Sequence, residues 1–225
     1  MKNEWKAIKM LLKQSCCKKK WLVSAAFICL GIVWKIFSLS GRPEVAEDLS
    51  PLFFAVAGIM PMEILLVNDI SGFVKGSVLR KRIQTTMATK SMFAGTMVAY
   101  LLYLAFLMIL GSVREGQPEV YLRPTLVYGV VVCFFGIGNV FLYKFFWAAL
   151  AGIYVICFCV GFVIGIFEDQ IDFVKYWKIL SPVGCAVASV FLIFAGCAIN
   201  LVMTRIFYKR NFSKSAFGAS MRKLV

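Results

Sequence analysis

Long blocks of apolar residues with almost no charge are the feature that most constrains how this chain folds. Such blocks lie at residues 21–39, 51–69, 92–112, 124–143, 145–167 and 182–204. About 18 or more apolar residues are enough to cross the roughly 30 Å hydrocarbon core of a bilayer as a helix. Because that core offers no water to backbone N–H and C=O groups, the helix must satisfy them internally. We therefore predict an all-α integral membrane protein with six transmembrane helices.

The charged residues divide unequally between the two sides of the predicted membrane. The termini, the connection 70–91 and Lys144 carry 19 of the 25 Lys and Arg residues, while eight of the 11 Asp and Glu residues lie in the other connections. By the positive-inside rule, both termini are expected in the cytoplasm, as parts of a cell-membrane protein. The net charge of +14 is then attracted to anionic lipid headgroups, and nucleic acid is not an expected partner.

Three parts are expected along the chain. Residues 1–20 form a cytoplasmic amphipathic segment, 21–204 form the transmembrane domain, and 205–225 form a basic cytoplasmic tail. In the first part, apolar residues recur at helical spacing opposite a face of lysines: Trp5, Ile8, Leu11, Leu12 and Cys16. This pattern is typical of a helix that lies in the membrane interface, and the alternative is a solvated basic tail.

Two connections have a helical pattern of their own. Between the second and third blocks, Leu79, Ile83 and Met87 recur at four-residue spacing with basic residues on the other faces. This predicts a short cytoplasmic amphipathic helix, and the alternative is a plain basic interfacial loop. Aromatic residues at helical spacing over 173–180 predict a short exterior helical segment before the last span. Pro182 then opens that span, because proline fits the first turn of a helix.

Apart from Asp69 at the very edge of its span, two charged residues lie within the predicted spans. An acid costs on the order of 2.5–3.5 kcal/mol at the centre of a span, so Glu63 is a functional candidate. Glu63 either serves a transport pathway, as a proton relay or a cation site, or pairs with a Lys or Arg near the cytoplasmic interface. Pairing is the preferred interpretation. Lys35, at the end of the first span, is expected to extend outward to the interface.

Pairs of small residues four positions apart recur in the spans. They let helix backbones approach closely and predict helix packing, within one chain or between two. The pairs are Ala148 with Gly152, Gly161 with Gly165, and Gly184 with Ala188.

Catalytic chemistry is poorly represented in this chain. It contains no histidine, which excludes Ser-His and Cys-His nucleophilic arrangements and histidine-based metal sites. It also lacks the glycine-rich motifs that cradle nucleotide phosphates. We expect no catalytic activity, no metal and no cofactor in the chain itself, and we favour a subunit that works by conformational change with energy supplied elsewhere.

The layout resembles the ABC-2 type permeases, the transmembrane subunits of ATP-driven exporters. The resemblance rests on the amphipathic segment 5–16, the connection 76–90, the Leu-Ser-Pro ending of segment 173–182, and the overall size. In the connection, Gly76 and Leu79 occupy places comparable to the family's Gly and Leu-rich turns. The family's Leu-Pro-Val/Ile-Ser-like run and following Lys correspond to residues 87–90, with Ala88 where Pro is usual.

The resemblance implies a function and its partners. Two permease chains, identical or related, would form a substrate pathway at their interface. Separate cytosolic ATPase subunits, which hold ATP and Mg²⁺, would bind the helix between spans two and three. Leu79 and Ile83 would be its apolar anchors in the ATPase groove. The whole coupling set is Ser77, Leu79, Arg80, Lys81, Arg82, Ile83 and Met87.

Two other functions remain open. One is a small-molecule-binding membrane subunit of an importer, which needs polar residues that converge on a ligand. Glu63, Asn139 and Asn200 are among the few candidates inside the spans. The other is a non-transporting assembly or structural protein of the membrane, which needs no polar interior.

Overall fold

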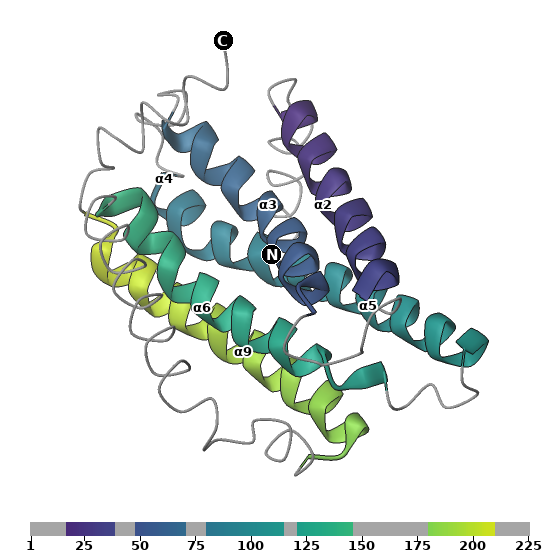
Figure 1. Cartoon of the computed structure of the whole chain (residues 1–225). Helices are drawn as coiled ribbons and strands as arrows, with labels where there is room; N and C mark the ends of the chain where they lie inside the picture. The colour runs from purple at the N-terminus through teal and green to yellow at the C-terminus, as the bar shows by residue number, and fades with distance from the viewer. Residues whose placement is uncertain (1–16, 39–47, 71–79, 115–120, 146–179, 210–225) are drawn as a thin grey trace, which may run out of the picture.

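Helices make up almost all of the chain that the structure, a computed structural model, describes. The described residues are 17–38, 48–70, 80–114, 121–145 and 180–209 (Figure 1). None of these residues forms a strand, so the all-helical part of the prediction is confirmed for this part of the chain. The long helices are α2 (Cys17–Ser38), α3 (Ser50–Ile70), α5 (Ala88–Arg114), α6 (Thr125–Lys144) and α9 (Pro182–Phe207).

Membrane character follows from the length and composition of these helices. Three stretches are long and apolar enough to cross a bilayer: Lys20–Ser38, Ile83–Val113 and Pro182–Phe207. Two further apolar stretches, Ser50–Leu66 and Thr125–Asn139, are shorter. The five long helices coincide with five of the six predicted blocks. The block at 145–167 lies outside the described residues except for Phe145, so the span count of six stays a prediction.

Helix α2 packs against α3, α3 packs against α5, and α6 packs against α9 (Figure 1). Helix α3 also contacts α6, and α5 also contacts α9. Helix α2 is antiparallel to α3, because Lys20 contacts Glu63 at one end and Lys35 contacts Asp48 at the other. Helices α6 and α9 are parallel instead. Ser189 near the start of α9 bonds Thr125 at the start of α6, and Lys144 at the end of α6 bonds Tyr208 after the end of α9.

Buried aromatic side chains fill the centre of the bundle. The ring centroids of Phe54 and Tyr103 lie 4.8 Å apart, and those of Tyr100 and Tyr128 lie 5.4 Å apart. Each buried tyrosine hydroxyl also has a polar partner: Tyr100 donates to the Ala186 carbonyl at 2.8 Å, and Tyr128 donates to a carbonyl of α5 at 2.6 Å. Such bonds offset the cost of burying a hydroxyl, so this cluster joins four helices without an unsatisfied phenol.

Glycines allow two close helix crossings. A Cβ added to Gly95 of α5 would lie 2.2 Å from the carbonyl oxygen of Gly58 in α3. A Cβ added to Gly136 of α6 would lie 2.3 Å from that of Gly196 in α9. Small residues permit this kind of approach in membrane helices, where packing must substitute for the hydrophobic effect. The predicted small-residue pairs at 148–152 and 161–165 lie outside the described residues.

The last helix begins as the sequence predicts. Pro182 is in its first turn, and the Ser181 hydroxyl caps it by accepting a hydrogen bond from the Gly184 backbone N–H at 3.0 Å. A serine cap of this kind satisfies one of the backbone donors that the first turn leaves free. Three predicted segments lie largely outside the described residues, which include only 17–20 of the segment 1–20, Leu180 of the exterior segment 173–180, and 205–209 of the tail 205–225. Helix α2 begins at Cys17, four positions before the predicted span.

Candidate functional site

The predicted coupling segment is the start of a continuous helical stretch that leads into the bundle. Helix α4 (Arg80–Arg82) is followed by a π-helical turn, η2 (Ile83–Met87), and then directly by α5. Lys81 and Arg82 are exposed at its beginning. Ser77 and Leu79 lie outside the described residues. The amphipathic helix predicted in this connection and the span predicted from residue 92 therefore belong to one continuous helical stretch.

The apolar members of this segment lie inside the bundle. Ile83 is 3% exposed and Met87 is 1% exposed, and η2 contacts α3 and α9. The resemblance implied that Ile83 is an anchor on a partner, but the structure does not bring this side chain to the surface. The physical reason is that a stripe of apolar residues at four-residue spacing fits a helix buried in its own protein as well as one that docks on another.

Polar side chains follow the same stretch inward and find partners there. The Thr85 hydroxyl donates to the Lys81 carbonyl at 2.7 Å, within the helix. One turn later, the Thr89 hydroxyl is 3.1 Å from Oδ1 of Asn200 in α9. The Asn200 amide in turn donates to the Gly136 carbonyl of α6 at 3.0 Å. Asn200, on α9, therefore connects α5 to α6. The sequence left this residue open as a ligand candidate, and in the structure its side chain bonds neighbouring helices.

Lys144 links this segment to the ends of two other helices. Its ammonium group lies 3.4 Å from Oε1 of Gln84 and 3.2 Å from the carbonyl of Tyr208. Lys81 places its ammonium 4.9 Å from the centroid of the Tyr208 ring. A lysine at the end of a helix also interacts favourably with the negative end of the helix dipole. The start of α4, the end of α6 and the end of α9 are thus joined by two lysines.

Glu63 lies at the same end of the bundle and forms an ion pair. Its Oε2 is 3.2 Å from the ammonium of Lys20, and the two side chains are 29% and 26% exposed. Glu63 is thus paired with a basic residue, and a transport role for it stays a prediction. Helix α3 continues through Pro61 to reach this position.

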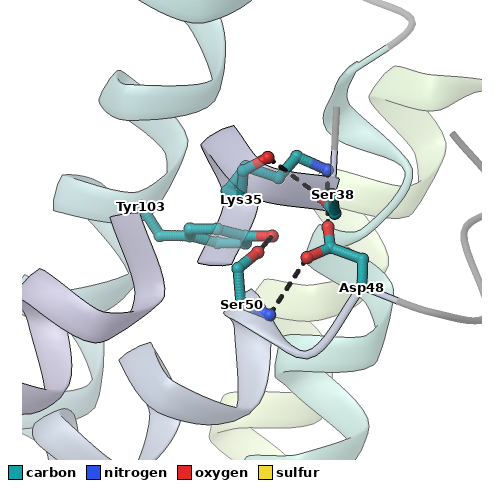
Figure 2. A network of polar contacts seen from close by, with 5 residues as sticks. All are labelled: Lys35, Ser38, Asp48, Ser50 and Tyr103. Atoms are coloured by element: carbon teal, nitrogen blue, oxygen red, sulfur yellow. Dashed lines mark hydrogen bonds and ion pairs between the residues drawn. The ribbon is translucent and has the colours of Figure 1, made fainter. Parts of the chain in front are cut away.

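A second charged network occupies the opposite end of α2 and α3 (Figure 2). The ammonium of Lys35, in the last turn of α2, is 2.5 Å from Oδ2 of Asp48. The other oxygen of Asp48 accepts from the Ser50 backbone N–H at 3.0 Å, where α3 begins. The Ser50 hydroxyl lies 3.0 Å from the hydroxyl of Tyr103 in α5. One network therefore joins three helices, and both charges are almost fully buried, with 7% and 4% of their side chains exposed.

Helix dipoles favour the signs of these two charges. The C-terminal end of a helix attracts a cation and the N-terminal end attracts an anion. Lys35 lies at the C-terminal end of α2, and Asp48 lies at the N-terminal end of α3. Each of the two groups also has a hydrogen bond. The expectation that Lys35 extends outward to the interface is wrong, because its ammonium turns inward to Asp48. The sequence alone could not predict this contact. Asp48 lies in the connection before α3, and it comes close to Lys35 only because α2 packs against α3.

The polar contacts described above join neighbouring helices of the chain. The described residues include no group of three or more His, Cys, Asp or Glu side chains that could hold a metal ion. Lys35 and Asp48 neutralise each other as a buried ion pair, whereas Lys20 and Glu63 pair at a partly exposed position. Sequence reasoning missed the bridging roles of Lys144 and Asp48, because both residues act through contacts between distant segments.

Comparisons with known proteins do not extend this account: no protein-family model matches the chain, and no curated protein or solved structure matches it.

Proposed function

We propose that this chain is the permease subunit of an ATP-driven exporter of the ABC-2 type. In this proposal it has six spans with both termini in the cytoplasm and forms a substrate pathway with a second permease chain. Separate cytosolic ATPase subunits drive it. The observation that carries the proposal is the continuous helical stretch from Arg80 into α5, which has an exposed basic start and a buried continuation.

The directions of the helices support the six-span count. Helices α2, α3, α5 and α6 alternate in direction, whereas α9 is parallel to α6, as the contacts of Ser189 and Lys144 require. The end of α6 and the beginning of α9 therefore lie at opposite ends of the bundle. Residues 146–179 must connect these ends, and α6 alone, with 20 residues, is about 30 Å long. In this proposal, the span predicted at 145–167 makes this connection.

The location of the basic residues supports the cytoplasmic assignment. Lys20, Lys81, Lys144 and Arg205 belong to different helices, and the contacts described above place them at one end of the bundle. This is the side on which the positive-inside rule puts the cytoplasm. A cytosolic partner meets the exposed Lys81 and Arg82 here.

In this proposal, the continuous helical stretch from Arg80 into α5 transmits movement of the ATPase to the rest of the bundle. A force on the Lys81–Arg82 end of the stretch moves a helix whose next turn is packed against α3 and α9. Lys144 and Tyr208 extend the same link to α6 and to the end of α9. Rigid elements with shared packing and polar contacts are the physical means by which one site affects another. The π-helical turn between the start and α5 is a geometry that is common at functional hinges.

Charge reversal at the exposed start tests this proposal. In a chain carrying Lys81→Glu and Arg82→Glu, we expect the co-purified ATPase to fall by about tenfold or more, since close like-charge contacts at an interface cost several kcal/mol. Arg205→Glu is the matched control, because Arg205 is also exposed at this end but lies on α9. Equal recovery of the ATPase with the double variant and with the control contradicts the coupling role.

A second candidate function is a non-transporting assembly protein of the membrane. It is favoured by one observation: the described ion pairs and the Asn200 bonds all serve contacts between helices of the chain itself. Co-purification separates the two candidates, because an assembly protein brings membrane proteins with it and no stoichiometric ATPase.

A further inference from the structure

An apolar groove lies between α2, α3 and α5. Its volume is 420 Å³, which is within the range of about 300–1,000 Å³ that is common for small-molecule sites. Small residues of α3 and α5 line part of its wall, where Gly58 and Gly95 cross. Larger side chains also line it, and Trp21, Val98 and Leu102 among them are 42%, 59% and 49% exposed. Because these exposed side chains are apolar, the groove opens to the hydrocarbon of the predicted membrane.

The groove is elongated along α5. Its lining on this helix extends from Ser91 to Leu102, which is about 16 Å at 1.5 Å per residue. Leu102 lies at the end where its neighbour Tyr103 contacts Ser50 at the beginning of α3. Ser91 lies at the opposite end, one helical turn beyond the glycine crossing in the direction of Glu63. A molecule that fills the groove is therefore long and narrow.

Two serines contribute to the lining, and one of them is left without a hydrogen bond among the described residues. The Ser24 hydroxyl donates to the Ala57 carbonyl of α3 at 3.1 Å. Ser91 is 3% exposed, and its hydroxyl has no hydrogen-bond partner in the part of the chain that the structure describes. Other hydroxyls of α5, those of Thr96 and Ser112, bond a carbonyl one turn back. A buried hydroxyl without a partner is unfavourable, so an oxygen of a molecule in the groove would satisfy a donor that the chain leaves free.

The charges around the groove indicate that the bound molecule is uncharged. No Asp, Glu, Lys or Arg side chain belongs to the lining that the described residues form. Lys20, which precedes Trp21, is already paired with Glu63 at 3.2 Å. An ionised group beside Ser91 would be buried with one hydroxyl and no counter-charge, and burial of an unpaired charge costs far more than burial of a neutral polar group. An ester or ether oxygen needs only the one donor that Ser91 offers.

We propose that this groove binds an uncharged, lipid-soluble molecule with one long alkyl chain and one oxygen acceptor at its end. The oxygen accepts a hydrogen bond from the Ser91 hydroxyl, and the alkyl chain extends along α5 towards Leu102. The molecule enters sideways from the membrane, past the exposed apolar side chains of the lining. The length of the groove, its uncharged lining and the free donor at one end all match this chemistry. The inference does not depend on the export function, because it concerns only a molecule held by this chain in its membrane.

A photoreactive fatty ester tests the proposal on the full chain in detergent. The probe is methyl palmitate with a diazirine in the middle of its chain, and mass spectrometry of the peptides locates the label. We expect one label per chain, within the groove-lining parts of α2 and α5. Unlabelled methyl palmitate should compete at least about tenfold better than palmitate, because palmitate has the same chain but is ionised in alkaline buffer.

Matched substitutions test the two contacts separately. Ala94→Leu adds bulk to the lining and is expected to abolish labelling, whereas Ala105→Leu, on the exposed face of the same helix, leaves it unchanged. Ser91→Ala removes the hydroxyl without adding bulk. It should weaken competition by methyl palmitate about fivefold, the effect of one ordinary hydrogen bond. Ser112→Ala, which alters an exposed serine of α5, leaves competition unchanged.

The proposal is overturned by equal competition from methyl palmitate and palmitate, or by undiminished labelling of Ala94→Leu. It is overturned as well if Ser91→Ala binds methyl palmitate as well as the parent chain does, or if the label is spread evenly over the described helices. A disulfide-linked dimer of Leu102→Cys that excludes the probe also overturns it, because a second copy then occupies the groove.

Discussion

Lys35 and Asp48 are 13 positions apart in the sequence, and they form an ion pair of 2.5 Å that is almost fully buried between two helices. Lys20 and Glu63 form the matching pair at the other end of the same two helices, at 3.2 Å and with more than a quarter of each side chain exposed. The hairpin of α2 and α3 is therefore fixed at both ends by opposite charges. The two pairs differ in burial, and this difference makes their contributions separable by experiment.

Removal of one charge from the buried pair should destabilise the protein strongly. Asp48→Asn keeps an oxygen for the Ser50 backbone N–H but leaves the Lys35 ammonium buried without its counter-charge. Such a change costs about 3–5 kcal/mol in proteins, and thermal unfolding in detergent measures it. Lys20→Met at the partly exposed pair is the control, with an expected loss of about 0–1 kcal/mol. Equal losses in the two variants contradict the burial of Lys35.

Replacement of both buried charges should restore most of the stability. In Lys35→Met combined with Asp48→Leu, no charge remains in the apolar site, and paired replacements of this kind are often neutral or stabilising. We expect the double variant to unfold at a higher temperature than Asp48→Asn. If it unfolds at a lower temperature, the network is needed for its hydrogen bonds to Ser50 and Tyr103, and the ion pair is not the dominant contact.

The crossing of α6 and α9 should reject even one methyl group at Gly136. A Cβ there would lie 2.3 Å from the carbonyl oxygen of Gly196, so Gly136→Ala must separate the two helices. Strain of this kind costs about 1–3 kcal/mol. Gly138→Ala is a control two positions away, since a Cβ added at Gly138 meets no atom within 4 Å. A comparable loss of stability in both variants contradicts the close crossing as the cause, because alanine is favoured over glycine inside a helix.

The hydrogen bonds of Asn200 should make a modest but measurable contribution to the free energy of unfolding. A double-mutant cycle between Thr89→Val and Asn200→Ala isolates their contact across α5 and α9. Measured couplings between membrane helices average about 0.6 kcal/mol and reach about 1.7 kcal/mol. The same cycle with Thr204→Val, whose hydroxyl bonds its own helix at Leu201, should give no coupling to Asn200. A coupling near zero for Thr89 is the result that rules the contact out.

The parallel arrangement of α6 and α9 predicts the sidedness of their ends. In an otherwise cysteine-free chain, Leu180→Cys before α9 should react with a membrane-impermeant maleimide added outside intact cells. Lys209→Cys after α9 should react only once the membrane is opened. Both native residues are exposed, so access to the reagent depends on the side of the membrane and not on burial. Labelling of Lys209→Cys from outside contradicts the assignment of the basic end to the cytoplasm.

The positions of the helices could be predicted because length and hydropathy act locally. An apolar block must form a helix in hydrocarbon wherever it lies, and five blocks do so among the described residues. The same pattern could not show what each helix faces. Ile83 and Met87 have the spacing of a docking stripe, yet η2 places them in the bundle, because burial depends on where α3 and α9 pack.

Contacts between distant segments were the part that the sequence could not supply. The pairing of Lys35 with Asp48 requires the end of α2 to meet the beginning of α3, and the apolar cavity lined by residues of α2, α3 and α5 requires all three helices to enclose it. The contact of Glu63 could be predicted only in part. Its cost inside a span made an interaction with a cation a reasonable expectation, but only the fold identifies that cation as Lys20.

Identification of what accompanies the chain in its native membrane tests the central claim most directly. The tagged protein is purified in a mild detergent, and every co-purifying protein is identified by mass spectrometry and quantified. The permease account predicts a soluble ATPase with a Walker A motif in stoichiometric amount, which is lost when Lys81 and Arg82 are both changed to Glu. Recovery of the chain with no ATPase, or with membrane proteins alone, contradicts it.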